Sequence, residues 1–355
     1  MRGLNAAWRS FRLSEMTLQE ALELHKNGQL DAAEQAYREH LLAEPGDAHA
    51  LHLLGVLRQQ CGDGDEALGL IRQAIVANPE DAQFHLSLGG ALLRAGDGEG
   101  ARASFERALV LDPNRVQTHG LLGLMALQSG DAADAESRFR VGRRAADEDP
   151  MILFGLGSIY LERRDAANAA KFLSRAAELK PDDSGIQTNL GCALFEQGAF
   201  GLAEKAFENA LRLRPDLSIA KLHLARSRMR QDKIEAAREL FSELLAANVQ
   251  TFSANAGLGD VARKQGRLVH ALKYYRRALA IDPAQAGAAS SCAWCMEVLG
   301  DLQGAAQYLA DGLRLNPNAD ELRRPLAELL DRLGRSEEAQ QVRNSGPTTS
   351  TGSVS

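Results

Sequence analysis

The sequence is poor in the features that mark several protein classes. Aromatic residues make up 5% of its 355 residues, it has four cysteines, and no apolar run approaches the length of a membrane span. Four cysteines do not suggest a disulfide framework, and the missing apolar run argues against membrane insertion. Residues 1–13 contain arginines with no apolar stretch after them, so they do not indicate a secretory signal. We therefore expect a cytoplasmic location, with the periplasm as an open alternative.

The chain also lacks an excess of basic residues. Its 41 Lys and Arg and 47 Asp and Glu give a formal net charge of −6. Because phosphate binding needs a basic face, nucleic acid is not predicted as the main partner. Ala, Leu, Gly, Arg and Glu are abundant instead, which favours helices with small residues at close contacts.

The prolines reveal an internal repeat. Pro45, Pro79 and Pro113 are 34 residues apart, and seven of the nine positions in this series up to Pro317 are proline. Counting each repeat from Ser14, the twentieth position is always alanine: Ala33, Ala67, Ala101, Ala135, Ala169, Ala203, Ala237, Ala271, Ala305 and Ala339. The eighth position is always Gly or Ala, and the twenty-fourth is aromatic or aliphatic. Small residues let two helices approach closely, and the large residues fill the space between them.

Turn residues separate the two helices of each repeat. Glycine occupies the fifteenth position in most repeats, where a left-handed backbone ends the first helix: Gly28, Gly62, Gly96, Gly130, Gly198, Gly266, Gly300 and Gly334. Proline near the end of the repeat stops the second helix. Arg164 and Asp232 replace this glycine in two repeats. Because a left-handed arginine costs about 1 kcal/mol, we expect a different turn at Arg164.

These residues resemble the tetratricopeptide repeat family from Ser14 to Arg343 without an insertion. The resemblance implies an all-α fold, a right-handed superhelical solenoid of antiparallel helix pairs forming one continuous domain. We predict a partial C-terminal capping repeat at 320–343, an N-terminal extension or extra helix at 1–13, and a disordered tail at 344–355. Nine full repeats precede the cap: 14–47, 48–81, 82–115, 116–149, 150–183, 184–217, 218–251, 252–285 and 286–319.

The resemblance also implies where a partner binds. In this family, positions two, five, six, nine, twelve and thirteen of each repeat line a concave groove. Here they give an apolar middle and a charged C-terminal part, and an open apolar groove indicates a partner site. The candidate partner-binding residues are Leu86, Phe154, Ser158, Asn189, Phe195, Leu222, Arg226, Met229 and Arg230. For several of these apolar side chains, the alternative to partner binding is packing in the core. For Arg226 and Arg230, the alternative is a solvated helix face.

No catalytic, cofactor-binding or metal-binding motif stands out. Cys292 and Cys295 form a C-x-x-C sequence, but it lies inside a predicted first helix, which favours buried structural cysteines. The Gly-Asp-Gly sequences at 62–64 and 96–98 follow helices and lack the lysine of a nucleotide-binding loop. The chain is therefore predicted to be no enzyme, to need no cofactor and to bind no metal.

The leading hypothesis is a protein-protein interaction scaffold or adaptor that binds a peptide or helix of a partner in the groove. The alternative is the repeat region of a larger bacterial glycosyltransferase or sulfotransferase-type enzyme, because the stretch 47–57 resembles the early repeats of such proteins. A co-chaperone is disfavoured because positions five and nine lack the Lys and Asn of the family's carboxylate clamp. Self-association through repeat ends or the groove stays open.

Overall fold

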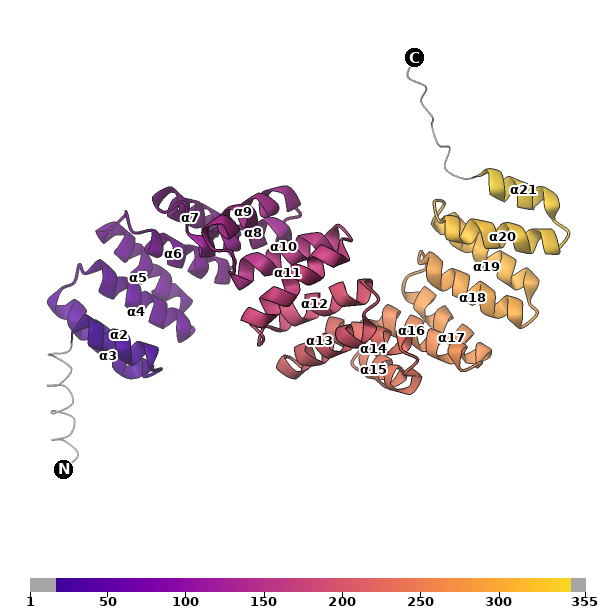
Figure 1. Ribbon diagram of the computed structural model, residues 1–355, viewed down its shortest axis with the longest axis horizontal. Coiled ribbons are helices and arrows are strands. Elements are labelled where there is room, and N and C mark those ends of the chain that lie inside the picture. The colour runs from indigo at the N-terminus through magenta and orange to yellow at the C-terminus, as the bar shows by residue number, and fades with distance from the viewer. Residues whose placement is uncertain (1–16, 346–355) are drawn as a thin grey trace, which may run out of the picture. The chain divides into compact units, whose positions relative to one another are not determined.

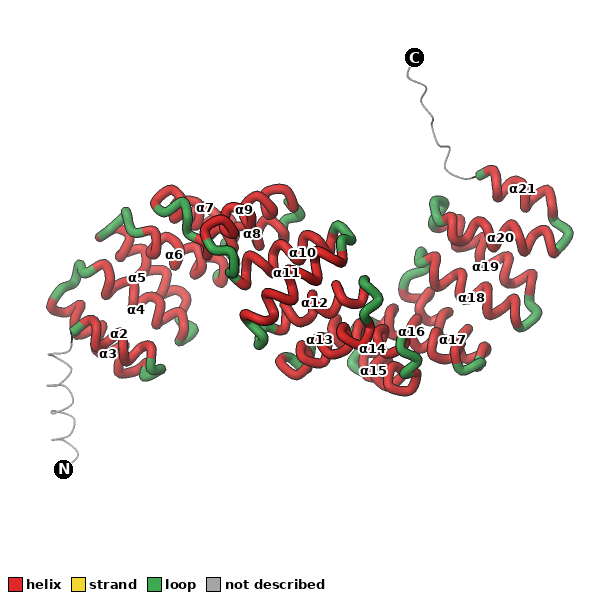
Figure 2. The backbone as a smooth tube through the Cα atoms, in the orientation of Figure 1, coloured by secondary structure: helices red, strands yellow, loops and turns green. Residues whose placement is uncertain are grey.

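The computed structural model describes residues 17–345, and within this range it contains twenty helices and no strand (Figures 1 and 2). Contacts between Cα atoms divide the chain into two compact units, of which unit 1 ends at Ile159 and unit 2 begins at Tyr160. The all-α fold predicted from the repeat is therefore confirmed. The number of repeats stays a prediction, and the extension at 1–13 and most of the tail at 344–355 fall outside the described residues.

Unit 1 is built from consecutive helix pairs that follow the 34-residue period. Most first helices have 13 residues and most second helices have 14, as in α4 and α5. Its helices are α2 (Leu18–Lys26), α3 (Leu30–Ala43), α4 (Ala48–Gln60), α5 (Gly64–Ala77), α6 (Ala82–Arg94), α7 (Gly98–Leu111), α8 (Val116–Gln128) and α9 (Ala132–Ala145), and the boundary between the units falls within α10 (Pro150–Glu162).

Unit 2 continues the same alternation. Its helices are α11 (Ala166–Leu179), α12 (Ser184–Glu196), α13 (Phe200–Leu213), α14 (Ser218–Arg230), α15 (Ile234–Ala246), α16 (Thr251–Lys264), α17 (Leu268–Ile281), α18 (Ala286–Val298), α19 (Leu302–Leu315), α20 (Asp320–Arg332) and α21 (Ser336–Asn344). The last helix thus reaches one residue beyond the predicted end of the cap.

Each tight turn within a pair uses a left-handed residue. Gly62 has φ of 90°, its amide donates to the Gln59 carbonyl, and the Asp63 amide donates to the Arg58 carbonyl. These bonds satisfy carbonyls that the end of a helix leaves free. The same conformation occurs at all eight glycines predicted for it, so the role of position fifteen is confirmed.

Arg164 adopts the same turn, and the expectation of a different geometry there was wrong. It has φ of 59°, its amide donates to the Leu161 carbonyl, and the Asp165 amide donates to the Tyr160 carbonyl. Asp232 is likewise left-handed, with φ of 58°. The hydrogen bonds and the packed helices on either side hold Arg164 and Asp232 in the left-handed conformation, although it is strained for residues other than glycine.

The core of each unit lies between the paired helices. All ten alanines at position twenty are fully buried, and so are the large side chains at position twenty-four. A Cβ atom added to Gly89 would lie 2.5 Å from the ring of Phe105, and one added to Gly191 would lie 2.5 Å from the ring of Phe207. The paired helices lie this close together only because glycine has no side chain, as the small-residue pattern predicts.

Candidate protein-binding surface

The predicted binding residues of unit 1 differ in accessibility. Leu86 is buried in a cluster with Phe105 and Leu122, so it offers almost no surface to a partner. Phe154 and Ser158 lie on α10 and are half-buried. The Ser158 hydroxyl donates to the Phe154 carbonyl at 2.9 Å. Unit 1 therefore presents part of the Phe154 ring, and a binding role for these residues stays a prediction.

In unit 2, two predicted residues belong to the core. Leu222 and Met229 are buried on α14, where they pack in one cluster with Phe241 and Leu258. Their position in the repeat faces the groove, but the neighbouring helix covers most of each side chain. Met229 still lines the pocket described below, whereas Leu222 does not.

Asn189 and Phe195, both on α12, are half-buried. The Phe195 ring meets the Phe200 ring edge-on, with centroids 5.3 Å apart, and lies 6.4 Å from the His223 ring. Such edge contacts hold an aromatic ring in one orientation. Phe195 therefore forms a fixed apolar wall rather than a mobile surface side chain.

Four of the nine predicted residues meet at one pocket in unit 2. It has a volume of about 180 Å³. Helices α12, α14, α15 and α16 contribute its lining: Phe195, Arg226, Met229, Arg230, Phe241, Ser253, Ala256, Gly257 and Asp260. Ser253 and Ala256 were missed as site residues, although they occupy groove positions two and five of their repeat. Reading those positions through α16 would have found them.

Both arginines of the pocket are exposed on α14 and stand one helical turn apart. The Arg230 guanidinium lies over the Phe200 ring, 5.2 Å from its centroid. Arg226 makes no hydrogen bond or ion pair with any described residue. Although solvent reaches it, loss of water to the surrounding protein lowers the pKa of Arg226 below the usual arginine value.

Two ionisable neighbours of Arg226 carry no charge at pH 7. Burial, with the nearby Arg226 charge, lowers the pKa of His223 to about 4, so this imidazole is neutral at pH 7. Burial raises the pKa of Cys192 to about 11, so the thiol is also neutral. The Oδ1 atom of Asp260 accepts hydrogen bonds from Tyr275 at 2.7 Å and Arg263 at 3.4 Å. The pocket therefore combines apolar side chains on part of its wall with two arginines and one carboxylate.

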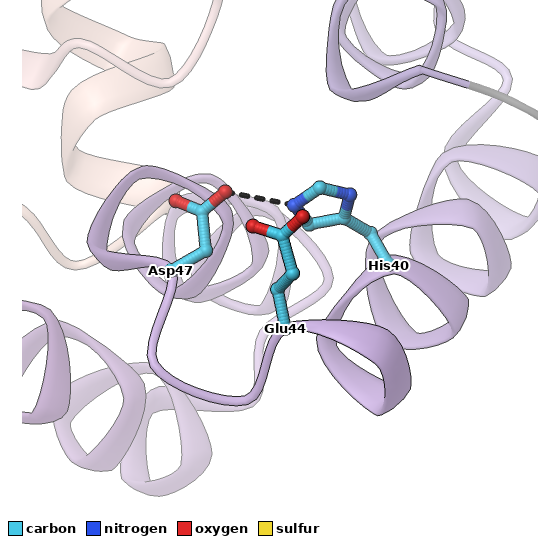
Figure 3. A group of neighbouring side chains, drawn as sticks. All are labelled: His40, Glu44 and Asp47. Atoms are coloured by element: carbon cyan, nitrogen blue, oxygen red, sulfur yellow. Dashed lines mark hydrogen bonds and ion pairs between the residues drawn. The ribbon is translucent and has the colours of Figure 1, made fainter.

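One group of side chains in unit 1 has the composition of a metal site. His40, Glu44 and Asp47 offer ligand atoms that all lie within 4.8 Å of one another (Figure 3). Asp47 Oδ1 accepts the amides of His49 and Ala50 at 2.9 and 3.1 Å, and Oδ2 lies 2.7 Å from His40 Nε2. Oδ1 of Asp47 thus caps α4 and Oδ2 pairs with His40, which accounts for the arrangement without a metal.

The C-x-x-C sequence lies within α18, and both cysteines are buried. Burial raises the pKa of Cys292 to about 12, which keeps the thiol protonated and unreactive. Among the described helices, none combines the length and apolar character required to cross a membrane.

Comparisons with known proteins give a family for most of the chain. The sequence profile described as "Cilia and flagella-associated protein 70 C-terminal domain" matches residues 13–221. Two profiles described as "Tetratricopeptide repeat" match residues 222–286 and 298–349. No curated protein matches the sequence.

Solved structures show the same fold at low sequence identity. The APC/C hetero-tetramer Cut9-Hcn1 matches with a TM-score of 0.54 and 15% identity, over 92% of this chain and 79% of that chain. A monomeric mutant of IFIT1 with Gppp-AAAA matches with a TM-score of 0.50 and 15% identity, over 92% and 78% of the two chains. Yeast Tom70 matches with a TM-score of 0.47 and 13% identity, over 92% and 90%.

The family profiles, with the Cut9-Hcn1 and IFIT1 structures, confirm the predicted solenoid class. The profiles, the glycine turns and the buried alanines agree on one conclusion. The chain belongs to the tetratricopeptide repeat family, and residues 13–221 belong to the group within it described as the Cilia and flagella-associated protein 70 C-terminal domain.

Proposed function

We propose that the protein is a non-catalytic scaffold that binds a segment of a partner protein, and that the pocket of α12, α14, α15 and α16 is a contact site. The observation that carries this proposal is the joining of exposed arginines to a partly apolar cavity of about 180 Å³. Sites that combine apolar walls with a few placed polar groups are typical of binding pockets. A cavity of this size suits single side chains of an extended segment better than a whole helix.

The family supports a protein partner. Tetratricopeptide repeats commonly mediate protein–protein interaction, and the similar Cut9 is found in a hetero-tetramer with Hcn1. A preformed groove lowers the ordering cost of binding because its helices are already held by their neighbours. The cytoplasmic location, self-association and the part played by Phe154, Ser158 and Asn189 stay predictions.

A pocket-filling variant tests this function. Ala256→Tyr places a ring in the cavity from a half-buried position on α16, whereas Ser290→Tyr places the same ring at the equivalent position of the next repeat. A display library of random short peptides is panned against the wild-type protein. We expect the enriched peptides to bind Ser290→Tyr normally and to lose binding to Ala256→Tyr, with circular dichroism showing equal helicity.

Two results would contradict the proposal. Peptides that bind Ala256→Tyr as well as the wild type would place binding elsewhere on the protein. A library that enriches nothing over an unrelated control protein would deny a peptide-binding role to the pocket.

A further inference from the structure

The pocket carries information about the chemistry of its ligand, beyond the proposed function on which this inference rests. Two guanidinium groups, Arg226 and Arg230, project from one face of α14 because they are four residues apart. Guanidinium groups pair with planar anions through two parallel hydrogen bonds. Their side chains are exposed, so an incoming ligand reaches both without rearranging the helix.

Arg226 is poised for an ion pair that the protein itself does not supply. It makes no hydrogen bond or ion pair with a described residue, and the nearby His223 and Cys192 are neutral at pH 7. Asp260 attracts Arg226 from across the pocket, but it accepts its hydrogen bonds from Tyr275 and Arg263. The protein has already removed part of the water around Arg226, as the direction of its pKa shift indicates. A ligand anion therefore meets a cation whose desolvation is partly complete, which strengthens their attraction.

Arg230 has a fixed place at the mouth of the pocket. Its guanidinium stacks over Phe200, 5.2 Å from the ring centroid, which restricts its rotamers and leaves the edge of the guanidinium available for hydrogen bonds. Less conformational entropy is lost when such an arginine binds an anion. The two arginines thus form a partly preorganised anion site.

Beside this anion site lies a cavity whose wall is apolar in part. Phe195, Met229 and Phe241 contribute its walls. Gly257 has no side chain, and a Cβ atom there would lie 2.4 Å from the Phe241 ring, so the helix backbone approaches the ring closely. At about 180 Å³, the cavity has room for one apolar side chain of a ligand.

We propose that this pocket binds an acidic segment of a protein, in which a Glu or Asp carboxylate pairs with Arg226 and Arg230 while a neighbouring apolar side chain enters the cavity. The carboxylate matches the geometry of the guanidinium groups, and the apolar neighbour matches the walls. A nucleic acid fits less well, because it brings a negative charge with every nucleotide to a chain whose net charge is −6.

The experiment starts from peptides selected by panning on the full-length wild-type protein. We expect acidic residues next to apolar ones to be enriched relative to the unselected library. The tightest peptide is then synthesised with a fluorescent label, together with a copy in which Gln and Asn replace Glu and Asp. Fluorescence anisotropy should show at least about a tenfold weaker affinity for the neutral copy.

Paired variants locate the effect. Arg226→Gln with Arg230→Gln should bind the acidic peptide at least about tenfold more weakly, and should bind the acidic and neutral peptides alike. The control, Arg212→Gln with Arg267→Gln, removes the same charge from two exposed arginines outside the pocket and should behave as wild type. This control separates local pairing from an effect of net charge.

The failures of the two proposals are distinguishable. Enriched peptides without acidic residues, or equal affinity for the acidic and neutral copies, would overturn the acidic ligand while leaving the peptide-binding function standing. No enrichment over the Ala256→Tyr variant would overturn both. Binding of a labelled oligouridylate that depends on Arg226 and Arg230, with no acidic peptide bound, would replace the acidic protein segment by a nucleic acid.

Discussion

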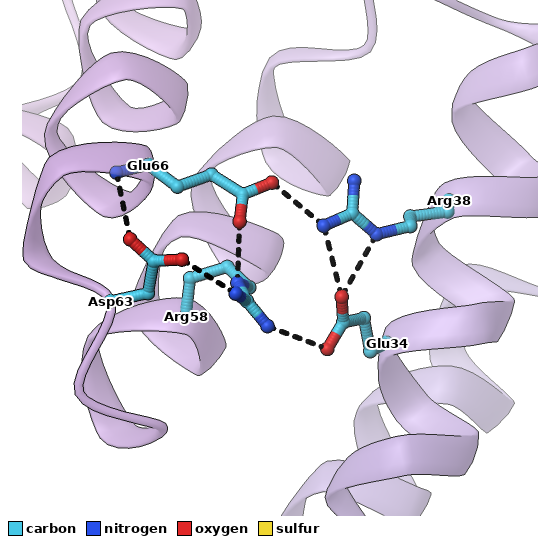
Figure 4. Close-up of polar contacts among 5 residues, drawn as sticks. All are labelled: Glu34, Arg38, Arg58, Asp63 and Glu66. Carbon is cyan, nitrogen blue, oxygen red and sulfur yellow. Dashed lines mark hydrogen bonds and ion pairs between the residues drawn. The ribbon is translucent and has the colours of Figure 1, made fainter.

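The two units contain ion-pair networks at corresponding repeat positions, but a cation lies at the centre of one and an anion at the centre of the other. In unit 1, Arg58 lies between three carboxylates, at 3.0 Å from Glu34 and 2.6 Å from both Asp63 and Glu66 (Figure 4). Arg38 joins the same group by pairing with Glu34 and Glu66 at 2.9 and 2.7 Å.

In unit 2, the central group is Glu204. It accepts hydrogen bonds from Arg228 at 3.0 Å, Gln231 at 2.8 Å and Lys233 at 2.6 Å. Arg228 also pairs with Glu208 at 2.9 Å. The Glu204 side chain is 10% exposed, less than the 21% of Arg58.

Comparing the two networks shows which positions keep the same charge and which change it. Position eleven is arginine in both networks and position twenty-one is glutamate in both. Positions sixteen and twenty-five exchange sign, from Asp63 and Arg38 in unit 1 to Lys233 and Glu208 in unit 2. The backbone geometry brings these four positions together. The residues at positions sixteen and twenty-five then decide whether a cation or an anion lies at the centre of the network.

The largest expected effect tests whether the anion-centred network stabilises unit 2. Glu204→Leu removes a largely buried carboxylate and leaves the partly exposed Arg228 and Lys233 without their common partner. Burial opposes ionisation of Glu204, but the hydrogen bonds from Lys233 and Arg228 outweigh it and lower the pKa of the carboxyl. We expect a loss of about 2 kcal/mol, below the value for a fully buried pair because the cations are partly exposed. Urea denaturation followed by circular dichroism measures it.

Hydrogen exchange shows where in the protein the Glu204→Leu variant loses stability, and this serves as the control. Hydrogen exchange should accelerate in α13 to α15, because repeat solenoids depend on contacts between neighbouring repeats. An unchanged urea midpoint, or faster exchange confined to unit 1, would contradict a stabilising role for Glu204.

A second comparison concerns two helix caps that have different basic partners. Asp47 caps α4 and lies 2.7 Å from His40, whereas Asp183 caps α12 and lies 2.8 Å from Lys180. Replacing either aspartate by alanine should cost about 1 kcal/mol, because two amides at the helix start lose their acceptor. The urea midpoints of Asp47→Ala and Asp183→Ala measure this cost, and unequal losses would show that the basic partner matters.

Acid titration sharpens the comparison of the caps. Burial opposes ionisation at both sites, but the basic partner and the backbone amides lower the pKa of Asp47 and of Asp183. A carboxyl with a lowered folded-state pKa stabilises the protein above its unfolded pKa, about 4, and loses this contribution as pH falls through the folded pKa. The acid limb of the stability curve should therefore be shallower in both variants. A limb identical to wild type would contradict this linkage.

The sequence predicted the features that depend on the repeat itself. A position that is alanine in ten repeats must be one at which two helices touch, and a glycine at a constant interval must end a helix. Core packing was the open alternative for several groove side chains. The sequence could not decide it for Leu222 and Met229, because their burial depends on how side chains such as Leu258 of the next repeat pack against them. The pocket needed the structure, since its lining comes from four helices.

A third comparison concerns the turns. All four described within-pair turns of unit 1 have glycine in the left-handed position, whereas unit 2 has Arg164 and Asp232 at two of its turns. Arg164→Gly should stabilise the protein by about 0.5–1 kcal/mol, because relief of the left-handed strain exceeds the entropy that glycine adds to the unfolded chain. Thermal unfolding measures the gain. Asp232→Gly should gain less, because Asp232 also pairs with Lys264. A loss at Arg164→Gly would show that this arginine makes a contact stronger than the strain.

The smallest effect tests the exposed ends of the two networks. Arg38 and Glu208 occupy position twenty-five with opposite charge, and their side chains are 47% and 48% exposed. Because solvent screens such pairs, Arg38→Leu and Glu208→Leu should each change the free energy of unfolding by less than about 0.5 kcal/mol, and added salt should reduce the difference further. A much larger loss for Arg38→Leu would have a specific meaning. It would show that Arg38, by pairing with Glu34 and Glu66, relieves the repulsion among the carboxylates around Arg58. The network centred on a cation would then need its outer partner, whereas the network centred on an anion would not.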